Sequence, residues 1–316
     1  MITVLRAPPF CTVQDLGRPG HLEAAVPRAG ALDPLALAAG NILVGNPRGA
    51  AALEWALGGG EIGFERSATI ALTGARATAK LGGCEVQPLE AIQARPGDTL
   101  VIERIDAGAW LYVAVSGGID VPSVLGSRST YLPGRFGGLE GRVLRSGDRL
   151  LLGRARRDFR SAPGAKPDGI DVGLLPSFDA PVAPIRILPG PDRDLIAGSW
   201  DEIVGADYKM SHMVSRMGYR LEPASPGLPG IGDRPSAPAC IGTLQLPAGG
   251  HPIVLLCDGP TVGGYARIGV VATADLGSFA QKRPGDTVRF RTVQPSEALE
   301  ALREQEALLN RLENGA

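Results

Sequence analysis

A tight turn that leads into a strand-like run recurs three times in this chain of 316 residues. The three copies are Arg95-Pro-Gly-Asp98, Ser146-Gly-Asp148 and Arg283-Pro-Gly-Asp286. Glycine accepts the left-handed backbone that tight turns need, and aspartate hydrogen-bonds to backbone groups nearby. The first and third copies share a similar lead-in although they lie far apart, which suggests two related β-barrel-like halves.

The glycine and proline content supports the prediction of a β-rich fold. The chain contains 44 glycines and 27 prolines, a share that favours many short elements joined by turns. Its 44% hydrophobic and 21% charged residues suit a globular protein, and its length suggests about two domains. We therefore predict a mainly β protein, with domains at residues 1–153 and 184–295 separated by a polar linker at 154–183.

Three helices are predicted from their end signals and apolar spacing. The clearest covers residues 34–44, because Asp33 is a favourable N-cap residue and Gly45 is placed to end the helix in a left-handed conformation. A short helix is expected over residues 194–203. Residues 296–316 form a C-terminal element whose leucines predict an amphipathic helix, packed on its own domain or on a partner chain.

Several function classes are disfavoured by the sequence. The net charge of −1 and the 5% aromatic content give no sign of binding to nucleic acid or to an anionic membrane. There is no P-loop, no GxGxxG after a strand and no GxSxG elbow, and the three histidines lack the spacing of metal ligands, so no metal site is expected. The four widely separated cysteines are interpreted as small buried residues in a reducing compartment. With no signal peptide recognised, we expect a cytoplasmic protein.

The stretch from Asp258 to Tyr265 is the first candidate for a functional site. It lies between two apolar β-type runs, so strand, loop and strand are predicted. Asp258 and Tyr265 supply an acid and a phenol, Thr261 supplies a hydroxyl, and Gly263-Gly264 allows backbone N–H groups to approach a ligand. A long hairpin with a Gly-Gly kink explains the same residues equally well, so both interpretations stay open.

Arginines mark two further candidate segments. Arg128 and Arg135 lie among glycines and hydroxyls in a long loop at 126–142, which suits either a carboxylate or phosphate site or a solvated surface loop. Arg216 and Arg220 lie in a run of mixed polar and apolar residues, where they either join strands or point into a pocket.

A polar loop near the N-terminus holds Asp15 and Arg18 three residues apart. The simplest interpretation is a turn with a local ion pair between these two side chains. Such a pair contributes little stability where solvent reaches it.

Motifs along the whole chain together resemble a known family. In order, they are Thr12-Val-Gln-Asp-Leu-Gly-Arg-Pro-Gly20, Gly30-Ala-Leu-Asp-Pro34, Gly45-Asn-Pro47, Ala52-Leu-Glu54, Ala71-Leu-Thr-Gly-Ala75, Gly117-Gly-Ile-Asp-Val-Pro122, Leu125-Gly-Ser-Arg-Ser-Thr130, Arg216-Met-Gly-Tyr-Arg-Leu221 and Thr261-Val-Gly-Gly-Tyr265. They resemble the biotin-dependent carboxyltransferase-like family over roughly residues 3–291. This family includes the C subunit of the bacterial ATP-dependent 5-oxoprolinase, the KipA proteins, allophanate hydrolase subunit 2 and the carboxyltransferase domain of urea carboxylase.

The resemblance implies two cyclophilin-like β-barrel domains and an enzyme subunit that is inactive alone. It implies a KipI-like partner, the B subunit, which completes a composite site, and a third chain, the A subunit. The assembled complex would use ATP to open 5-oxo-L-proline to L-glutamate, although this chain has no recognisable cofactor-binding motif. A homo-oligomer of such heterodimers is an open alternative.

Two other functions stay open under the same resemblance. One is the carboxyltransferase component of a biotin-dependent urea carboxylase or allophanate pathway, with biotin as its cofactor. The other is a KipA-like regulatory protein that binds a KipI-type kinase inhibitor. Because the urea carboxylase is normally one very long chain, the C subunit of 5-oxoprolinase is the preferred interpretation.

The resemblance also implies a site at the interface with the partner. Its expected catalytic residues are Arg216, which would hold the substrate carboxylate, Asp258, which would orient the amide N–H or a water, and Tyr265, which would donate to the developing oxyanion. Ala237 stands where many relatives carry glutamate, and this departure favours the regulatory alternative. The expected substrate-binding residues are Thr261, Gly263, Gly264, Arg220 and Arg128.

Overall fold

The structure of this chain, a computed structural model, describes residues 1–155, 183–196, 200–223 and 230–315. The chain divides into two compact units. The first unit comprises residues 1–18, 29–179 and 306–316, and the second comprises residues 19–28 and 180–305. The predicted linker at 154–183 lies, apart from its ends, outside the described residues, so the predicted domain boundaries stay a prediction.

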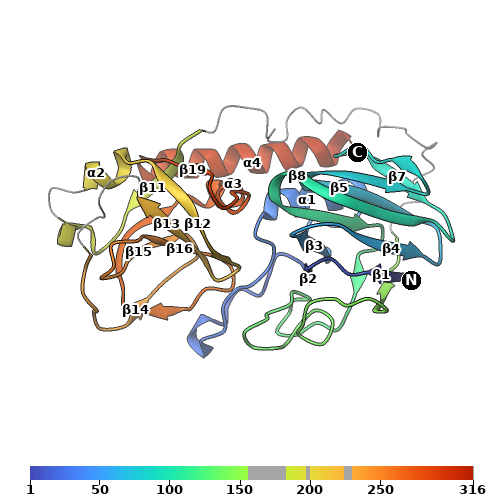
Figure 1. Cartoon of the computed structure of the whole chain (residues 1–316), viewed down its shortest axis with the longest axis horizontal. Coiled ribbons are helices and arrows are strands. Elements are labelled where there is room, and N and C mark those ends of the chain that lie inside the picture. Colours follow the sequence, from blue (N-terminus) through green and yellow to red (C-terminus); the bar gives the residue numbers. More distant parts are fainter. Residues whose placement is uncertain (156–182, 197–199, 224–229, 316) are drawn as a thin grey trace. The chain divides into compact units, whose positions relative to one another are not determined.

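The first unit is built on an antiparallel sheet of ten strands in the order β2-β3-β8-β4-β1-β10-β9, with β5 paired to β8 and also to β6 and β7 (Figure 1). The long strand β8 is its spine, because it pairs with β3, β4 and β5. Buried side chains such as Leu53, Ile70 and Val113 fill the interior. The strands are β1 (Ile2–Arg6), β2 (Phe10–Gln14), β3 (Ala52–Ala56), β4 (Gly60–Phe64), β5 (Ala68–Leu81), β6 (Cys84–Glu85), β7 (Ala91–Ala94), β8 (Thr99–Val115), β9 (Ile119–Asp120) and β10 (Arg149–Leu152).

Helix α1 (Pro34–Leu43) of the first unit confirms the helix predicted at 34–44. The Asp33 Oδ1 atom accepts a hydrogen bond from the Ala36 amide at 3.0 Å, which caps the helix N-terminus. Gly45 has a φ of 73° just after the helix, the left-handed conformation that favours glycine. Asp33 and Gly45, the predicted start and end signals, therefore mark the ends of this helix in the structure.

The predicted C-terminal helix is also confirmed, as α4 (Pro295–Gly315). Its residues 306–315 belong to the first unit, where they pack on α1. The Arg48 guanidinium stabilises this packing, because it donates hydrogen bonds to Glu306, Asn310 and Glu313 at 2.6, 2.7 and 2.8 Å. The apolar side chains in the contact are Ala38, Ala39, Ile42, Leu308, Leu309 and Leu312.

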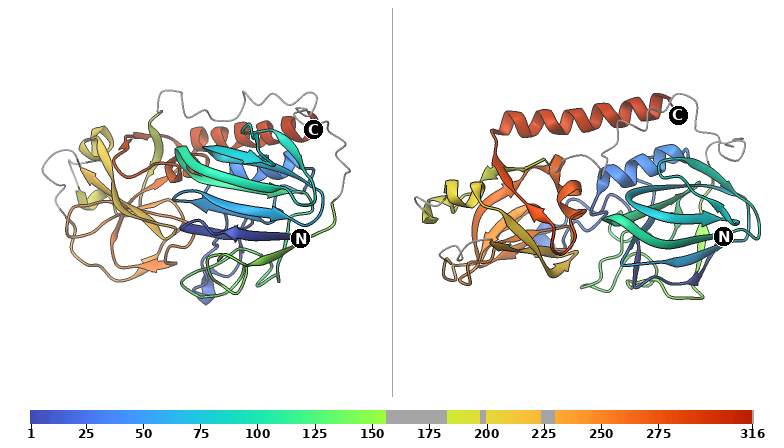
Figure 2. Two further views of the ribbon diagram at one scale, coloured as in Figure 1. Left: turned by 45° about the vertical axis from the view of Figure 1, so that its right-hand side comes forward. Right: turned by 45° about the horizontal axis from the view of Figure 1, so that its top comes forward.

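The second unit contains a sheet of eight strands in the order β19-β12-β13-β16-β15-β18-β11-β20 and a separate two-stranded ribbon, β14-β17 (Figure 2). Strands β11 and β20 pair in parallel, and the other neighbours pair antiparallel. The strands are β11 (Ile185–Pro189), β12 (Tyr208–Ser215), β13 (Gly218–Pro223), β14 (Ala237–Pro238), β15 (Thr243–Leu246), β16 (Ile253–Leu255), β17 (Val262–Gly263), β18 (Ala266–Val271), β19 (Thr287–Val288) and β20 (Phe290–Thr292). The short helices of this unit are α2 (Trp200–Gly205), α3 (Leu276–Ala280) and 3-10 turns at Leu22–Ala24, Arg193–Ile196 and Thr273–Asp275.

Both sheets are nearly closed into barrels, and strands account for 39% of the described residues against 19% for helices. The prediction of a mainly β protein is therefore confirmed. The short helix expected over 194–203 needs correction, because a 3-10 turn ends at Ile196, α2 begins at Trp200, and residues 197–199 lie outside the described part. Among the helices that the structure describes, none combines the length and apolar character needed to cross a membrane.

The recurrent Gly-Asp turn has the geometry that its sequence predicts in all three copies. The glycines have left-handed φ values of 90°, 93° and 90°, and in each copy an aspartate Oδ2 atom accepts a backbone amide three residues earlier at 2.7 Å. Each turn leads into a strand, namely β8, β10 and β19. The glycines are Gly97, Gly147 and Gly285, and the aspartates are Asp98, Asp148 and Asp286.

The cysteines depart from the prediction that all four are buried. Cys11 and Cys257 are buried, whereas Cys84 and Cys240 are exposed, and all four are free thiols. Burial raises the pKa of the Cys11 thiol far above its ordinary value, and the charge on Glu54 adds to this rise. Cys11 is therefore held in its unreactive thiol form.

Candidate functional site

The loop from Asp258 to Tyr265 lies in the second unit and is not a hairpin. The strands before and after it, β16 and β18, each pair with β15, which lies between them. The strand, loop, strand prediction is confirmed, and the alternative of a long hairpin is wrong. The loop itself contributes β17, whose Gly263 pairs with Ala237 of β14. A short ribbon thus covers the sheet next to β15.

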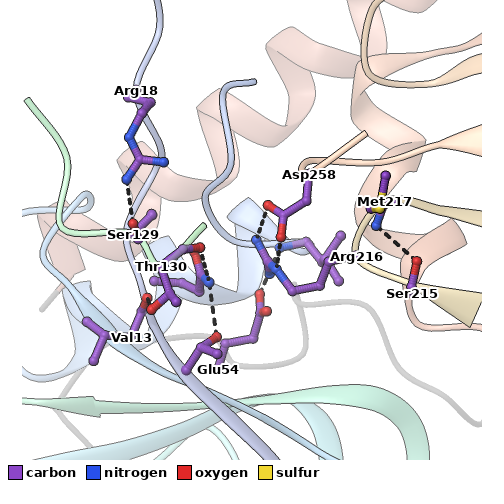
Figure 3. A network of polar contacts seen from close by, with 12 residues as sticks. Val13, Arg18, Glu54, Ser129, Thr130, Ser215, Arg216, Met217 and Asp258 are labelled. Carbon is purple, nitrogen blue, oxygen red and sulfur yellow. Dashed lines mark hydrogen bonds and ion pairs between the residues drawn. The ribbon is translucent and has the colours of Figure 1, made fainter. Parts of the chain in front are cut away.

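A buried ion pair joins Arg216 to Asp258 at the start of this loop (Figure 3). Arg216 lies in the tight turn between β12 and β13, where Ser215 pairs with Gly218. Its Nε and Nη2 atoms donate to the two carboxylate oxygens of Asp258 at 2.9 and 3.1 Å, and the Asp258 amide donates to the Arg216 carbonyl at 3.0 Å. The two side chains are 3% and 1% exposed. The sequence-predicted pair is therefore brought together and fixed.

This fork changes the chemistry that Arg216 can offer. A guanidinium holds a carboxylate best through two parallel N–H groups, and here Asp258 already takes two of the N–H groups of Arg216. An incoming carboxylate would have to compete with a buried partner of the same charge. The role of Arg216 as substrate holder stays a prediction, and the geometry favours it as the residue that positions Asp258.

The remaining predicted residues of the loop differ in exposure. Thr261 is half-buried, and its carbonyl accepts the Ala239 amide at 2.9 Å. Tyr265 is 41% exposed, so its phenol reaches the surface of the unit. An exposed phenol in the same loop as a fixed carboxylate suits a hydrogen-bond donor to a ligand. Their roles stay predictions.

The Gly263-Gly264 pair makes room for the protein's own groups. A Cβ atom at Gly263 would lie 2.8 Å from the Nε2 atom of Gln245, and one at Gly264 would lie 3.0 Å from the Arg234 carbonyl oxygen. The Gly264 carbonyl also accepts the Arg234 amide at 2.9 Å. Other parts of the protein thus approach these glycines closely, and one of them is the Gln245 amide, which lies against the loop.

Arg220 and Gln245 lie on the sheet of the second unit, and Gln245 lies against this loop. Arg220 of β13 is half-buried, and no described residue forms a hydrogen bond or ion pair with its side chain. Gln245 was missed by the sequence analysis. The only amide side chain of the strand Thr243–Leu246 is the signal that marks it, because this strand is buried at all four positions.

The loop at 126–142, the other candidate segment, belongs to the first unit and is built around Asp15. The Asp15 carboxylate accepts hydrogen bonds from the Gly17 and Arg128 amides at 2.8 and 2.6 Å and from the Ser127 and Ser129 hydroxyls at 2.6 and 2.5 Å. Four donors saturate the carboxylate and pin the loop to β2. Asp15 therefore has a structural role here.

The arginines of this loop do not gather around an open site. Arg128, predicted to bind substrate, donates from Nε to the Val121 carbonyl at 2.9 Å and from Nη2 to Asp120 at 3.1 Å. Arg135 is exposed and has a left-handed φ of 53°. Within this unit the geometry favours the surface-loop interpretation of 126–142, and substrate binding by Arg128 stays a prediction.

The predicted ion pair between Asp15 and Arg18 is wrong. Arg18 is 1% exposed, and it donates to the backbone carbonyl of Ser129 (Figure 3) and to that of Val124. Its guanidinium also lies over the Phe136 ring, 5.0 Å from the centroid. A cation above an aromatic face is attracted by the ring quadrupole, so Arg18 fixes the loop by stacking and hydrogen bonding.

Glu54 is a buried carboxylate of the first unit that the sequence analysis quoted only within a motif. It is 0% exposed and accepts hydrogen bonds from the Tyr112 hydroxyl at 2.8 Å and the Leu32 amide at 2.9 Å. Burial and the neighbouring Glu54 charge raise the pKa of Tyr112 well above its ordinary value. The Tyr112 hydroxyl also accepts the Asp33 amide at 2.8 Å, so this network supports the start of α1.

The family model described as "Carboxyltransferase domain, subdomain A and B" matches residues 24–292. This chain belongs to that family. It is 38% identical over 315 residues to the 5-oxoprolinase C subunit of Escherichia coli (strain K12), covering 99% of this chain and 97% of that protein. It is 34% identical over 317 residues to the 5-oxoprolinase C subunit of Haemophilus influenzae, again with 99% and 97% covered.

Solved structures of carboxyltransferase relatives share this fold. The crystal structure of the K. lactis urea amidolyase superposes with a TM-score of 0.87 at 29% identity, covering 99% of this chain and 20% of that one. The chain thus spans about a fifth of that much longer protein. The family match includes Arg216, Asp258 and the loop that ends at Tyr265, and it ends before helix α4 begins at Pro295.

Proposed function

We propose that this carboxyltransferase-family chain is the C subunit of a 5-oxoprolinase. The observation that carries the proposal is the correspondence over almost the whole length of two relatives that bear this name, each covered to 97%. In the proposed reaction, water adds to the cyclic amide of 5-oxo-L-proline, the C–N bond breaks, and L-glutamate forms while the complex hydrolyses ATP. The A and B subunits, the latter KipI-like, are the proposed partners.

The second unit offers groups that suit this substrate. A lactam has an N–H that seeks an acceptor and a carbonyl that seeks a donor as negative charge develops on its oxygen. Asp258 is an acceptor whose orientation is fixed by the Arg216 fork, and Tyr265 offers an exposed hydroxyl from the same loop. In this proposal Asp258 orients the amide N–H or the attacking water, and Tyr265 donates to the oxyanion.

The proposal also concerns the cellular compartment and the use of ATP and biotin. Free thiols at Cys84 and Cys240 on the surface suit the reducing cytoplasm, which is the compartment we propose for this protein. ATP is a substrate of the assembled complex in this proposal, and biotin belongs to the second candidate function alone.

The second candidate is the carboxyltransferase component of a urea carboxylase. It is favoured by the 33% identity over 324 residues to the urea amidolyase of Lachancea kluyveri, of which this chain covers 18%. Biotin would carry the carboxyl group in that reaction. A KipA-like regulatory role is the third candidate, and Ala237 opposite Gly263 is the feature that favours it.

Reconstitution separates these functions. The purified chain is mixed with the A and B subunits of a bacterial 5-oxoprolinase, and glutamate is measured with 5-oxo-L-proline and ATP. We expect glutamate from the three-subunit mixture and none from the chain alone. Carboxylation of urea with a biotin carboxylase and biotin carrier, without glutamate formation, would establish the second candidate instead. Relief of KipI-type kinase inhibition without either reaction would establish the third.

A further inference from the structure

Gln245 presents a buried hydrogen-bond donor to the loop at 258–265. The side chain is 3% exposed, and its Nε2 atom has no hydrogen-bond partner among the described residues. That atom lies against Gly263, where any Cβ would approach it to 2.8 Å. Leaving a buried donor unpaired destabilises a folded chain, and few such groups persist without a function. The Gln245 amide therefore lies against Gly263 of the loop without an acceptor among the described residues.

The register of the sheet places Gln245 in one row with Arg220. Ile253 of β16 is opposite Gln245 of β15 on one side and opposite Arg220 of β13 on the other. Residues directly opposite each other in antiparallel strands point to the same face of a sheet. Neighbouring strands lie about 4.8 Å apart, so the backbones of Arg220 and Gln245 are roughly 10 Å apart. The half-buried Ile253 lies between them.

The two arginines Arg216 and Arg220 differ in whether an acidic side chain compensates their positive charge. Arg216 is compensated by Asp258, whereas no ion pair to Arg220 is present among the described residues. Arg220 and the Gln245 amide are thus two donors, one of them cationic, on either side of an aliphatic side chain. Two donors of this kind select an anionic acceptor such as a carboxylate. Ile253 suits the methylene groups of a small ring.

We propose that Arg220 and Gln245 form the carboxylate subsite, with Arg220 as the charged partner, Gln245 Nε2 as the second donor and Ile253 beneath the ring of the substrate. This inference rests on the proposed 5-oxoprolinase function and deepens it. It assigns carboxylate recognition to Arg220 and Gln245 in place of Arg216. Asp258 and Tyr265 are then left to act on the lactam.

The test uses Gln245→Met and Arg220→Gln in the three-subunit complex with 5-oxo-L-proline as substrate. Loss of a hydrogen bond to a charged acceptor weakens binding by about 10- to 100-fold, so KM should rise by that factor while kcat falls less than threefold. Arg220→Lys should recover part of the loss, because it keeps the charge without the fork. Lys209→Met, which removes an exposed cation from the neighbouring strand β12, is the control and should leave KM unchanged.

Thermal unfolding of the isolated full chain distinguishes binding from structure. Methionine resembles glutamine in length but has no unpaired donor, so Gln245→Met should keep or raise the melting temperature. A clear fall in melting temperature would assign Gln245 to the fold and overturn the inference. Unchanged KM in both variants of an active complex would overturn the inference and leave the proposed function intact. Failure of the wild-type complex to form glutamate would overturn both.

Discussion

The two glycine-rich loops of this protein each form part of an arrangement with an aspartate and an arginine, and the two arrangements differ. In the first unit, three donors from the loop at 126–142 and the Gly17 amide surround the Asp15 carboxylate, and Arg128 turns onto its own unit. In the second unit, the loop at 258–265 holds Asp258 with a single guanidinium, exposes Tyr265 and leaves the Gln245 donor unpaired among the described residues.

The difference shows which property marks a candidate site. Aspartate, arginine, serine and glycine are equally good at pinning a loop and at binding a ligand, so residue types do not separate the two cases. Hydrogen-bond satisfaction does, because a saturated carboxylate has little capacity left for a substrate. Four predictions would break or sharpen this comparison, in order of decreasing effect.

The largest effect is expected from Asp258→Asn. The change removes the carboxylate from a buried ion pair, which costs about 3 kcal/mol of the free energy of unfolding, and turnover should fall about 10²- to 10³-fold. Urea unfolding of the chain and glutamate formation by the complex measure the two effects. The double variant Arg216→Met with Asp258→Leu should regain stability without regaining turnover. Full turnover in Asp258→Asn would show that the loop at 258–265, like the loop at 126–142, has only a structural role.

Tyr265→Phe should separate activity from stability. The hydroxyl belongs to an exposed side chain, so its removal should leave the melting temperature unchanged while kcat falls about 10²-fold. Tyr131→Phe, in the loop of the first unit, is the matched control and should retain wild-type kcat. Equal kcat in both variants would show that the phenol of Tyr265 takes no part in the reaction.

Asp15→Asn should give the opposite pattern. The neutral amide has one acceptor oxygen in place of a carboxylate that accepts four hydrogen bonds, so the free energy of unfolding should fall by about 2 kcal/mol. The kcat and KM of the folded complex should not change. A selective loss of kcat without loss of stability would place this loop in the catalytic site after all.

The smallest effect concerns acid stability in the recurrent turn at Asp148. Hydrogen bonds from the Arg142 side chain, aided by the Arg145 amide, lower the pKa of Asp148 despite its partial burial. Because this pKa is lower in the folded state, the stabilisation is complete above the unfolded pKa, near pH 4, and is lost as pH falls through the folded pKa. Asp148→Asn should therefore lower the free energy of unfolding at pH 7 by about 1 kcal/mol through the lost hydrogen bonds, and flatten the decline of stability below pH 4.

Urea unfolding at several pH values tests this prediction. Glu140→Gln is the control, since Glu140 contacts the same arginine but its side chain is 70% exposed. It should have the smaller effect on stability at every pH. An acid decline in Asp148→Asn that matches wild type would show that Asp148 does not contribute to it.

Local signals account for what the sequence predicted well. The cap at Asp33, the left-handed Gly45 and the three Gly-Asp turns depend on atoms within a few residues, so the sequence contains the whole arrangement. The loop at 258–265 was likewise found from its flanking strands and its residue types. Helix α4 followed from leucine spacing alone.

Long-range pairing accounts for what the sequence did not reveal. The hairpin alternative at 258–265 is wrong because β15, which precedes both strands in sequence, lies between them. Three of the donors to the Asp15 carboxylate lie 112 to 114 residues away and the fourth is the Gly17 amide, so the nearby Arg18 side chain is not among them. Gln245 becomes a candidate binding residue only once the strand register places it opposite Ile253 and against Gly263.

The contact between α1 and the end of α4 sets an order of events during synthesis. Arg48 and Glu313 are 265 residues apart, and the leucines that cover Ala38 and Ile42 lie at positions 308–312. At about 5–20 residues per second, a ribosome needs roughly 15–50 s to translate that interval. Throughout this time the apolar side of α1 has no α4 to cover it. A nascent chain stalled before residue 308 should therefore recruit chaperones at α1, and release of α4 should end that exposure.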